Sequence, residues 1–407
     1  MIVLQINTSV NIGSTGRIAE DLGRILITSG HESYIAFGRQ AYGSNSNVIK
    51  IGCKVDHALH VIQSRLLDRH GFGSTIATKL LVKHIEKINP DIVHLHNIHG
   101  YYLHVLVLFD YLKSKDYPVI WTFHDCWPFT GHCSYFDAVN CYKWQSICND
   151  CPNKHGYPTS WFLDNSSRNF LQKEKIFNGL NNMILVSPSQ WMAQHLRNSF
   201  LGNYNIKVIN NGIDLKQFRP VYDKELLSEY NLNDQYVLGV ASTWDKRKGL
   251  EDFIKLRNLI PAGIIIILIG LSSKQINKLP NGIIGIKRTR DIAELAQLYS
   301  QAVAFINPTY VDNFPTTNIE ALACGTPVIT YDTGGSPEAI DDTTGFIVKK
   351  GDIEGLANAI YKVFEGGSIF YQNACRLRAE KLFSRDERFG DYLELYQNAI
   401  SNNNESL

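Results

Sequence analysis

The chain lacks any long hydrophobic run: its longest purely aliphatic stretch is IIIILI, at residues 264–269 of 407. A helix that spans a bilayer needs about 20 consecutive apolar residues, so this short stretch is expected to be a buried core strand. The amino terminus enters an apolar segment, residues 2–6, without a basic region or a small-residue cleavage site. These absences predict a cytoplasmic protein.

An excess of charge of either sign is also missing. Forty basic residues face 39 acidic ones, which gives a net charge of +1 and a pI of about 7.6, and no stretch is polybasic. This balance argues against nucleic acid as a partner. The hydrophobic content of 44% and the length fit two α/β domains, and the chain has repeated βα patterns with no tandem repeat before the polar tail at 401–407.

The most informative segment begins with AVAFIN at residues 302–307, which predicts a buried parallel strand that ends at Pro308. We expect a helix over about 318–324, capped by Thr316 or Thr317, with Glu320 in its first turn. The unpaired N–H groups of such a helix end attract anions, and Asp312 is expected across the same crevice. The plainer alternative is that Glu320 only complements the helix dipole and Asp312 only forms a turn.

Two flanking motifs favour the functional interpretation. The segment VLGVASTWDKRKG, residues 237–249, is an apolar strand that leads to Arg247 and Lys248, two cations placed to meet a diphosphate at the carboxyl end of a sheet. The segment TGGSPE, residues 333–338, contains two glycines that permit positive φ and close approach of backbone to a ligand. Each motif alone is weak, since a basic turn is usually solvated.

In this order and spacing the motifs resemble those of glycosyltransferase family 4, retaining enzymes of the GT-B fold that use nucleotide-sugar donors without a divalent metal. The matched elements are the KG turn at 248–249, the acid-x7-acid element at Asp312 and Glu320, ALACGTPVI at 321–329, GGSPE at 334–338 and TTGFIVKKGD at 343–352. The resemblance implies an α/β protein with two Rossmann-like, doubly wound domains that face a central cleft. It also implies that no cofactor is required for catalysis.

The resemblance assigns roles to individual residues. Glu320 is expected to bind the donor ribose, Arg247 and Lys248 the diphosphate, and Asp312 the transferred sugar near its reacting centre. Phe314, Thr316 and Thr317 complete the expected donor-binding set. Departing diphosphate charge would be stabilised by Arg247, Lys248 and the helix-terminal N–H groups, and we expect front-face attack with an oxocarbenium-like transition state.

The resemblance continues into the first half. Gly13 and Gly16 lie in a glycine-rich loop before a helical pattern and are expected to contribute to the donor site. His124 follows the strand pattern PVIWTFHD and matches the family histidine that contacts the donor sugar; a histidine at a strand end is equally often structural. NGID at 211–214 resembles a family phrase near the domain hinge. We predict an acceptor-side domain at 1–205, a donor domain at 206–380, and a final helix at 381–407 that crosses back.

The chain departs from the family pattern at three positions. The first acid is Asp312 rather than Glu, Pro315 has no N–H to offer the donor sugar, and Thr243 stands where an Arg is common. These departures motivate an alternative, a GT-B scaffold or binding subunit whose donor site has decayed. A dehydrogenase is disfavoured because the loop at 13–16 lacks the G-x-G-x-x-G spacing.

Cysteines concentrate in an irregular insertion at 126–155, which holds five of the eight. Cys133, Cys141, Cys148 and Cys151 have spacings that suit a tetrahedral metal, so a structural Zn²⁺ is favoured over free buried thiols and over disulfides. A catalytic zinc is disfavoured because four thiolates leave no open position. A zinc deaminase is disfavoured because its signature needs HxE followed by PCxxC, whereas Pro152 here follows the CxxC.

The sequence therefore predicts transfer of a hexosyl unit, with retention, from a nucleotide diphosphate sugar to a hydroxyl of a saccharide or lipid-linked saccharide. The family commonly builds bacterial capsule, O-antigen or exopolysaccharide. Lipid-linked acceptors would bring the protein to the inner face of the plasma membrane as a peripheral protein. Residues 101–112 are a candidate membrane-side patch, although their helical spacing favours an ordinary core helix.

Overall fold

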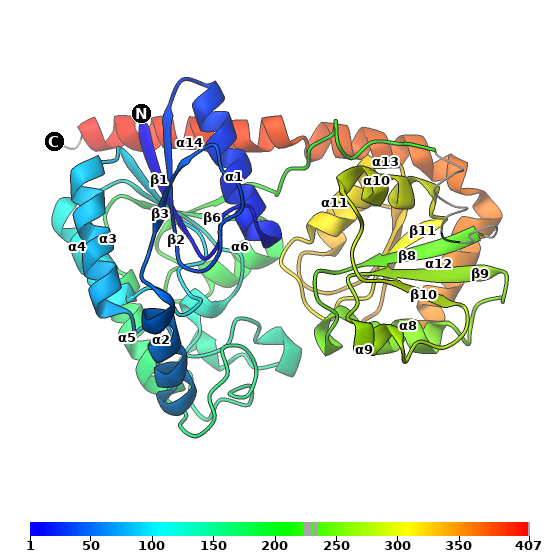
Figure 1. Ribbon diagram of the computed structural model, residues 1–407, viewed down its shortest axis with the longest axis horizontal. Helices are drawn as coiled ribbons and strands as arrows, with labels where there is room; N and C mark the ends of the chain where they lie inside the picture. The colour runs from blue at the N-terminus through cyan, green and yellow to red at the C-terminus, as the bar shows by residue number, and fades with distance from the viewer. Residues whose placement is uncertain (223–229, 231–234, 406–407) are drawn as a thin grey trace. The chain divides into compact units, whose positions relative to one another are not determined.

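The chain forms two compact units in the computed structural model, which describes residues 1–222, 230 and 235–405 (Figure 1). Unit 1 comprises Met1–Ile209 and the chain from Phe389 onward, and unit 2 comprises Asn210–Arg388. The first division lies four residues after the predicted boundary at 205/206. The second lies eight residues after the predicted boundary at 380/381. Each unit is described by itself below.

Unit 1 contains a seven-stranded parallel sheet in the order β3-β2-β1-β4-β5-β6-β7. The order reverses between β1 and β4, as in doubly wound folds, so the carboxyl ends of β1, β4 and β5 lie next to one another. The elements are β1 Ile2–Asn7, α1 Gly13–Thr28, β2 Glu32–Phe37, β3 Asn47–Lys50, α2 Lys54–Leu67, α3 Thr75–Ile88, β4 Ile92–Leu95, α4 Val105–Lys115, β5 Val119–Thr122, α5 Ser166–Phe177, β6 Met183–Ser187, α6 Gln190–Arg197 and β7 Asn205–Val208.

Helices cover both faces of this sheet, because alternate residues of a strand point to opposite sides. On β1, Leu4 and Ile6 belong to the core that includes α3, α4 and α5, whereas Val3 packs with α1. Between β5 and α5 the chain has only three 3-10 turns, Trp127–Phe129, Asp137–Val139 and Lys143–Gln145. The predicted irregular insertion is therefore confirmed.

Unit 2 contains a six-stranded parallel sheet in the order β10-β9-β8-β11-β12-β13, with the reversal between β8 and β11. Its elements are β8 Gln235–Val240, α8 Leu250–Leu256, β9 Ile264–Ile269, α9 Ser273–Ile276, β10 Ile283–Ile286, α10 Ile292–Gln301, β11 Ala304–Asn307, α11 Thr316–Ala323, β12 Val328–Tyr331, β13 Gly345–Val348, α12 Ile353–Gly366 and α13 Ser368–Leu382, with 3-10 turns at Lys246–Lys248 and Pro337–Ala339. The two sheets together confirm the predicted pair of Rossmann-like domains. The aliphatic run at 264–269 is strand β9.

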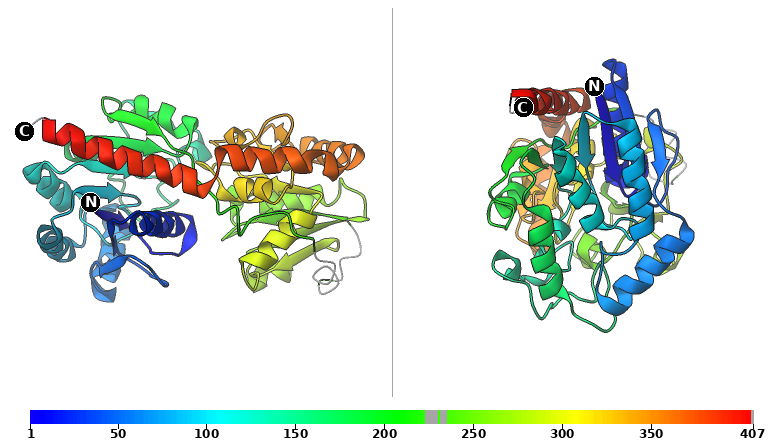
Figure 2. Two further views of the ribbon diagram at one scale, coloured as in Figure 1. Left: turned by 90° about the horizontal axis from the view of Figure 1, so that it is seen from above. Right: turned by 90° about the vertical axis from the view of Figure 1, so that its left-hand side faces the viewer.

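The last helix, α14 Arg385–Glu405, begins in unit 2 and continues in unit 1; it is the red helix at the C-terminus in Figure 2. Its beginning is fixed within unit 2, where Arg385 N donates to Ile213 O at 2.9 Å and Arg385 Nη1 pairs with Asp214 Oδ2 at 2.8 Å. Its continuation packs in unit 1, where the Tyr396 hydroxyl lies 2.6 Å from His94 Nδ1 on β4. The NGID segment is thus paired with the start of the returning helix.

Several predicted boundaries were wrong by a few residues. The predicted strand at 302–307 begins only at Ala304, because Ala302 ends α10. The predicted helix at 318–324 begins at Thr316, so the capping position falls to Pro315 and neither Thr316 nor Thr317 caps it. Proline at this position needs no N–H partner, which explains the earlier start. Glu320 consequently lies in the second turn, not the first.

Residues 101–112 do not form an exposed patch. Helix α4 buries Leu108, Phe109 and Leu112 in the core of unit 1, as expected of an ordinary core helix. Across residues 1–222 and 235–405, none of the helices has both the length and the apolar content that a membrane crossing demands.

Candidate functional site

Three loops of unit 2 meet at the carboxyl edge of its sheet, where β8, β11 and β12 are neighbours. Two glycines allow this approach. Gly249 has φ +75°, and a Cβ there would lie 2.3 Å from Pro308 O; Gly334 has φ +58°, and a Cβ there would lie 1.9 Å from Asp312 O. Any other residue would push the loops apart, so the glycines of the KG and GGSPE motifs are required by packing.

The predicted diphosphate cations lie against the loop that follows β11. Arg247 O accepts hydrogen bonds from Tyr310 N at 2.7 Å and from Thr309 Oγ1 at 3.3 Å, and its guanidinium Nη1 donates to Val311 O at 3.2 Å. The Lys248 ammonium forms an ion pair with the Asp312 carboxylate. Arg247, Lys248 and Asp312 therefore lie close together.

The ion pair determines the charge of Asp312. Burial alone would raise the pKa of this carboxyl, but Lys248 and Arg247, together with a hydrogen bond from Asn313 N, hold it below its usual value. Asp312 is therefore ionised at neutral pH and neutralises part of the cationic pair. Both partners keep 18% of their side-chain surface exposed, so a ligand has access to them.

The start of α11 is positioned by a buried amide network that the sequence reasoning missed. Asn318 accepts a hydrogen bond from Asn307 Nδ2 at 2.8 Å and donates to Ser336 Oγ at 3.0 Å. Asn307 ends β11, and Ser336 follows the glycines after β12, so the network joins the helix to two strands. The available signal was a polar residue at the end of a strand that is otherwise apolar. Thr316 and Thr317 lie in the first turn and are partly exposed.

Glu320 and Phe314 are more deeply placed than the sequence suggested. Glu320 is 5% exposed, and its Oε2 accepts a hydrogen bond from the Tyr299 hydroxyl at 3.0 Å. Phe314 is buried against Phe383, and its carbonyl accepts from Asn211 Nδ2 at 3.0 Å. The Phe314 side chain thus packs in the core of unit 2. Glu320 is thus bonded to Tyr299 on α10, whereas the Asp312 carboxylate is bonded to Lys248 and to Asn313 N.

His124 lies in unit 1, two residues after the end of β5, in a chain of three side chains that come from β1 and from the segments that follow β4 and β5. Gln5 Nε2 donates to Ala19 O at 2.9 Å, which turns its Oε1 towards His96 Nε2 at 3.0 Å; His96 Nδ1 lies 3.1 Å from His124 Nε2. An amide oxygen only accepts, so His96 carries its proton on Nε2 and accepts at Nδ1. His124 is then protonated on Nε2, and its Nδ1 is an acceptor.

Burial lowers the pKa of His124 to about 4, and it lowers that of His96 well below the usual value. Both rings are neutral at physiological pH, so His124 offers a hydrogen-bond acceptor and no positive charge. The signal for this chain was present in the pattern DIVHLH, whose alternating histidines place His94, on β4, and His96, the residue after β4, on one side of the sheet.

The residues predicted to form a glycine-rich loop before a helix, 13–16, are instead the first turn of α1. Gly13 is the first helical residue and has φ +69°, while a Cβ on Gly16 would lie 3.2 Å from Asn11 N. Asn11 N donates to Gly16 O at 2.9 Å, so the loop folds back over the first turn. The N-cap is Ile12, which has no capping side chain, and the first-turn N–H groups have no intrahelical acceptor.

The predicted zinc ligands line one cavity in the insertion of unit 1. Cys133, Cys141, Cys148 and Cys151 carry free thiols, as do the remaining cysteines of the chain. In the part of the chain that the structure describes, no three His, Cys, Asp or Glu side chains form a ready metal-binding group.

Comparison with known proteins gives matches over most of the chain. Residues 15–217 match the family model described as Glycosyltransferase Family 4, and residues 234–365 match the one described as Glycosyl transferases group 1. The putative colanic acid biosynthesis glycosyl transferase WcaC of Escherichia coli K12 is 24% identical, over 98% of this chain and 100% of its own length.

A second relative and one solved structure add to this. The Campylobacter jejuni N,N'-diacetylbacillosaminyl-diphospho-undecaprenol alpha-1,3-N-acetylgalactosaminyltransferase is 29% identical, over 56% of this chain and 62% of its own length. The crystal structure of Anabaena HepE in complex with UDP superposes with a TM-score of 0.68 at 15% identity, over 98% of this chain and 100% of that one. That identity is too low to show more than a shared fold.

Proposed function

Since this chain belongs to the family 4 glycosyltransferases, we propose that it moves a hexosyl unit, with retention, from a nucleotide diphosphate sugar to a hydroxyl of a saccharide or lipid-linked saccharide. The observation that carries the proposal is the meeting of Lys248, Arg247 and Asp312 beside the start of α11. Cations, an acid and unpaired helix N–H groups at a sheet switch point are what a sugar diphosphate needs.

In this proposal unit 2 holds the donor. Lys248 and Arg247 bind the diphosphate, and the first-turn N–H groups of α11 at Thr316 and Thr317 stabilise the charge that develops as the diphosphate leaves. Glu320 binds the ribose hydroxyls. Asp312, released in part from Lys248 when the diphosphate arrives, accepts hydrogen bonds from the transferred sugar. No metal ion is assigned to this reaction.

His124 is assigned to the transferred sugar as a neutral acceptor. Its Nδ1 would receive a hydroxyl proton of the sugar in a hydrogen bond, and the Gln5–His96 chain keeps that nitrogen unprotonated. No side chain is assigned as a covalent nucleophile, so we favour front-face attack by the acceptor hydroxyl on C1 through an oxocarbenium-like transition state. In that reaction the new glycosidic bond forms on the face from which the diphosphate departs.

The pathway that we propose is synthesis of a bacterial surface polysaccharide on a lipid-linked intermediate. The names of the relatives support it, because one refers to colanic acid biosynthesis and another to an undecaprenol diphosphate acceptor. A lipid-linked acceptor requires the enzyme to work at a membrane surface, here as a peripheral protein on the cytoplasmic face.

A surface suited to that contact lies on α2 of unit 1. Val55, Leu59 and Ile62 are 64%, 61% and 52% exposed and follow one another at helical spacing on one face. Trp161 and Phe162 are also exposed and adjoin the end of α2, where Trp161 N donates to Arg65 O at 2.7 Å. We call these five residues the α2 face. Helices α2 and α3 carry five Lys or Arg (54, 65, 79, 83 and 87) against two acids (56 and 86), which favours anionic lipid.

The decisive experiment is a screen of UDP-, GDP- and ADP-sugars for donor hydrolysis and for transfer to a lipid-linked acceptor, with the anomeric configuration of the product read by NMR. We expect one nucleotide series to support turnover with retention. A decayed scaffold would instead show no saturable binding of any nucleoside diphosphate, and an inverted product would refute the proposed mechanism.

A further inference from the structure

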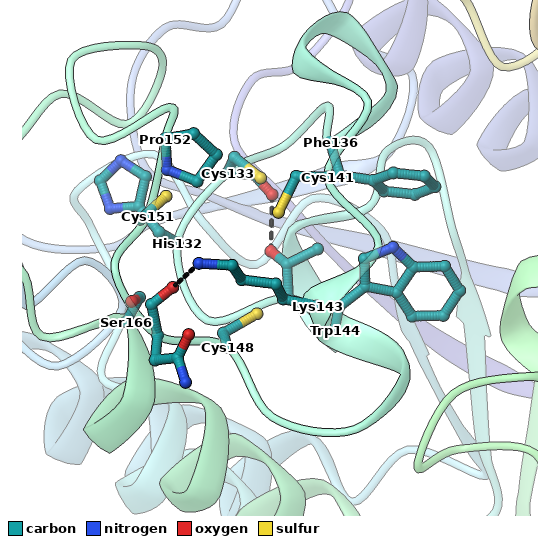
Figure 3. A pocket seen from close by; sticks show the side chains of 12 residues that line it. His132, Cys133, Phe136, Cys141, Lys143, Trp144, Cys148, Cys151, Pro152 and Ser166 are labelled. Carbon is teal, nitrogen blue, oxygen red and sulfur yellow. Dashed lines mark hydrogen bonds between the residues drawn. The ribbon is translucent and has the colours of Figure 1, made fainter.

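The insertion between β5 and α5 has little regular structure to hold it. Its own core is a small aromatic cluster in which Phe129 and Phe136 each lie 4.9 Å from Trp144 between ring centroids. Beside this cluster is a cavity of about 20 Å³ lined by Cys133, Cys141, Cys148, Cys151 and His132 (Figure 3). A cavity of that size accepts one particle the size of a water molecule or an ion.

The sulfurs around the cavity are close to one another. The thiols of Cys133 and Cys151 are within hydrogen-bond reach, and Cys148 lies near enough to both for their charges to interact. Cys141 interacts in the same way with Cys148. In addition, Gly131 N lies 3.2 Å from Cys148 Sγ, where it donates a hydrogen bond of the kind that stabilises a thiolate.

His132 provides an independent sign that the cavity takes a ligand. This residue is 2% exposed, and its Nδ1 lies 2.5 Å from Asp68 Oδ1, so the proton of a neutral ring sits on Nδ1. The other nitrogen, Nε2, is buried and has no hydrogen-bond partner. An unpartnered buried polar atom costs about 1–3 kcal/mol, and this one belongs to a residue that lines the cavity.

A buried cation lies next to the same cavity. Lys173 is 1% exposed; its ammonium donates to Trp127 O at 2.7 Å and Thr130 O at 3.0 Å and lies 3.5 Å from the centre of the Trp127 ring. Burial lowers its pKa to about 7, while the neighbouring Cys148 and Cys133 favour its charged form. Among the described residues, no carboxylate forms an ion pair with this ammonium. A centre of net negative charge at the cysteines would supply the missing counter-charge.

We propose that Cys133, Cys141, Cys148 and Cys151 bind one Zn²⁺ as four thiolates in a closed structural site, in the cavity that His132 also lines. Each thiol releases its proton to solvent on binding, and the resulting centre carries a charge of −2 that is partly offset by Lys173. The described side chains do not yet converge on one ion position, so the cysteines must turn about χ1 into another staggered rotamer.

The site would fix the chain that follows His124. Asp125, three residues after β5 ends, binds His99 Nε2 at 2.7 Å, and the hydroxyl of Tyr157, beyond the last cysteine, lies 3.3 Å from His99 Nδ1. Zinc would therefore hold in place the segment between Asp125 and Tyr157, the two residues that contact His99. The role is structural, since four protein ligands leave no position for a substrate.

The test is metal analysis of the full-length protein purified without added zinc, together with thiol titration. We expect about one Zn²⁺ per chain, lost in Cys148→Ser and Cys151→Ser and kept in Cys53→Ser, which removes an exposed cysteine of the same unit. Zinc content of the unaltered protein decides the question even where a variant fails to fold. Absence of zinc with reactive thiols, or a Cys133–Cys151 disulfide found by mass spectrometry, overturns the proposal.

Cobalt substitution tests the ligand set. The d–d absorption of Co²⁺ differs between four sulfur ligands and three sulfurs with one nitrogen, and we expect the four-sulfur spectrum in both the unaltered protein and His132→Gln. A nitrogen-containing spectrum that changes in His132→Gln would make His132 a ligand and refute the four-thiolate assignment. These measurements do not use enzymatic turnover, so their outcome is separable from the proposed transferase activity.

Discussion

The Lys248 ammonium is ion-paired with the Asp312 carboxylate, which joins the loops that follow the neighbouring strands β8 and β11 of unit 2. The pair means that the proposed diphosphate cation and the proposed sugar-binding acid restrain each other before a donor arrives. Binding a diphosphate must therefore compete with Asp312 for Lys248, and this competition can be measured.

Replacing the acid should separate binding from turnover. In Asp312→Asn, Lys248 is no longer neutralised, so we expect the cognate nucleoside diphosphate to bind about threefold to tenfold more tightly, an effect of about 1 kcal/mol for a partly exposed pair. Turnover should still fall at least tenfold, because the acid near the sugar is lost. Calorimetric titration and initial rates test this, with Lys248→Met as the control that loses both. Weaker nucleotide binding in Asp312→Asn would contradict the competition.

Glu320 should act through its charge. Glu320→Gln keeps an oxygen for the Tyr299 hydroxyl and leaves the fold intact, but it weakens the proposed charge-assisted bonds to the ribose, so turnover should drop at least tenfold. Tyr299→Phe breaks the same internal hydrogen bond without changing the carboxylate and should keep most activity. If both variants have equal activity, the ribose role of Glu320 is wrong.

His124 should work as a neutral acceptor. We expect His124→Phe to lose at least tenfold in kcat/KM and His124→Asn, which keeps a polar group near the position of Nδ1, to lose less. Because the pKa of His124 is lowered to about 4, its protonation should produce no inflection in the pH–rate profile between about pH 5.5 and 8.

The hydrogen-bond chain behind His124 provides a second variant. Gln5→Met removes the acceptor that fixes the tautomer of His96, so a smaller loss of kcat/KM, about threefold, is expected without a change in nucleotide affinity. An inflection near the usual histidine pKa in the unaltered enzyme that disappears in His124→Phe would contradict the neutral assignment.

Acid should unfold unit 1 before unit 2, since all 13 histidines of the chain lie in unit 1. Burial lowers the pKa of His60 to about 3, and it lowers the pKa values of His70, His94 and His96 well below 6.5. The unfolded chain then binds more protons than the folded one below pH 6.5. The stabilisation is complete above this pH and is lost as the pH falls towards the folded pKa values.

The expected loss is at most about 1.4 kcal/mol per pH unit for each such histidine. Hydrogen exchange followed by mass spectrometry between pH 7 and pH 5 should therefore show protection falling in residues 1–209 while residues 235–388 change little. Equal loss in both units would show that the buried histidines do not govern acid stability.

The α2 face should bind anionic membranes. Replacing Val55, Leu59 and Ile62 together by Ser should weaken binding to vesicles that contain anionic phospholipid by at least tenfold, because each aliphatic side chain gains about 1.5 kcal/mol or more when buried. Ile369→Ser with Phe370→Ser is the matched control, since these side chains are 81% and 75% exposed on α13 of unit 2. Unchanged vesicle binding in the triple variant would exclude the α2 face as the docking surface.

Sequence alone determined what depends on local pattern. Apolar period and strand length predicted the two α/β domains and the buried strand β9 at 264–269, because both are signals carried by neighbouring residues. The sequence did not predict the first residue of α11 correctly, because the N-cap is Pro315 and not Thr316 or Thr317.

Only the tertiary structure decided the contacts between residues far apart in the chain. The Gln5–His96–His124 chain joins three strands, the pairing of Arg385 with Asp214 spans most of unit 2, and the exposure of Val55, Leu59 and Ile62 depends on which helices pack beside α2. The protonation and exposure of a side chain depend on residues that are close in space but far apart in the sequence, so sequence spacing does not predict them. Strand and turn signals, in contrast, come from residues adjacent in the sequence.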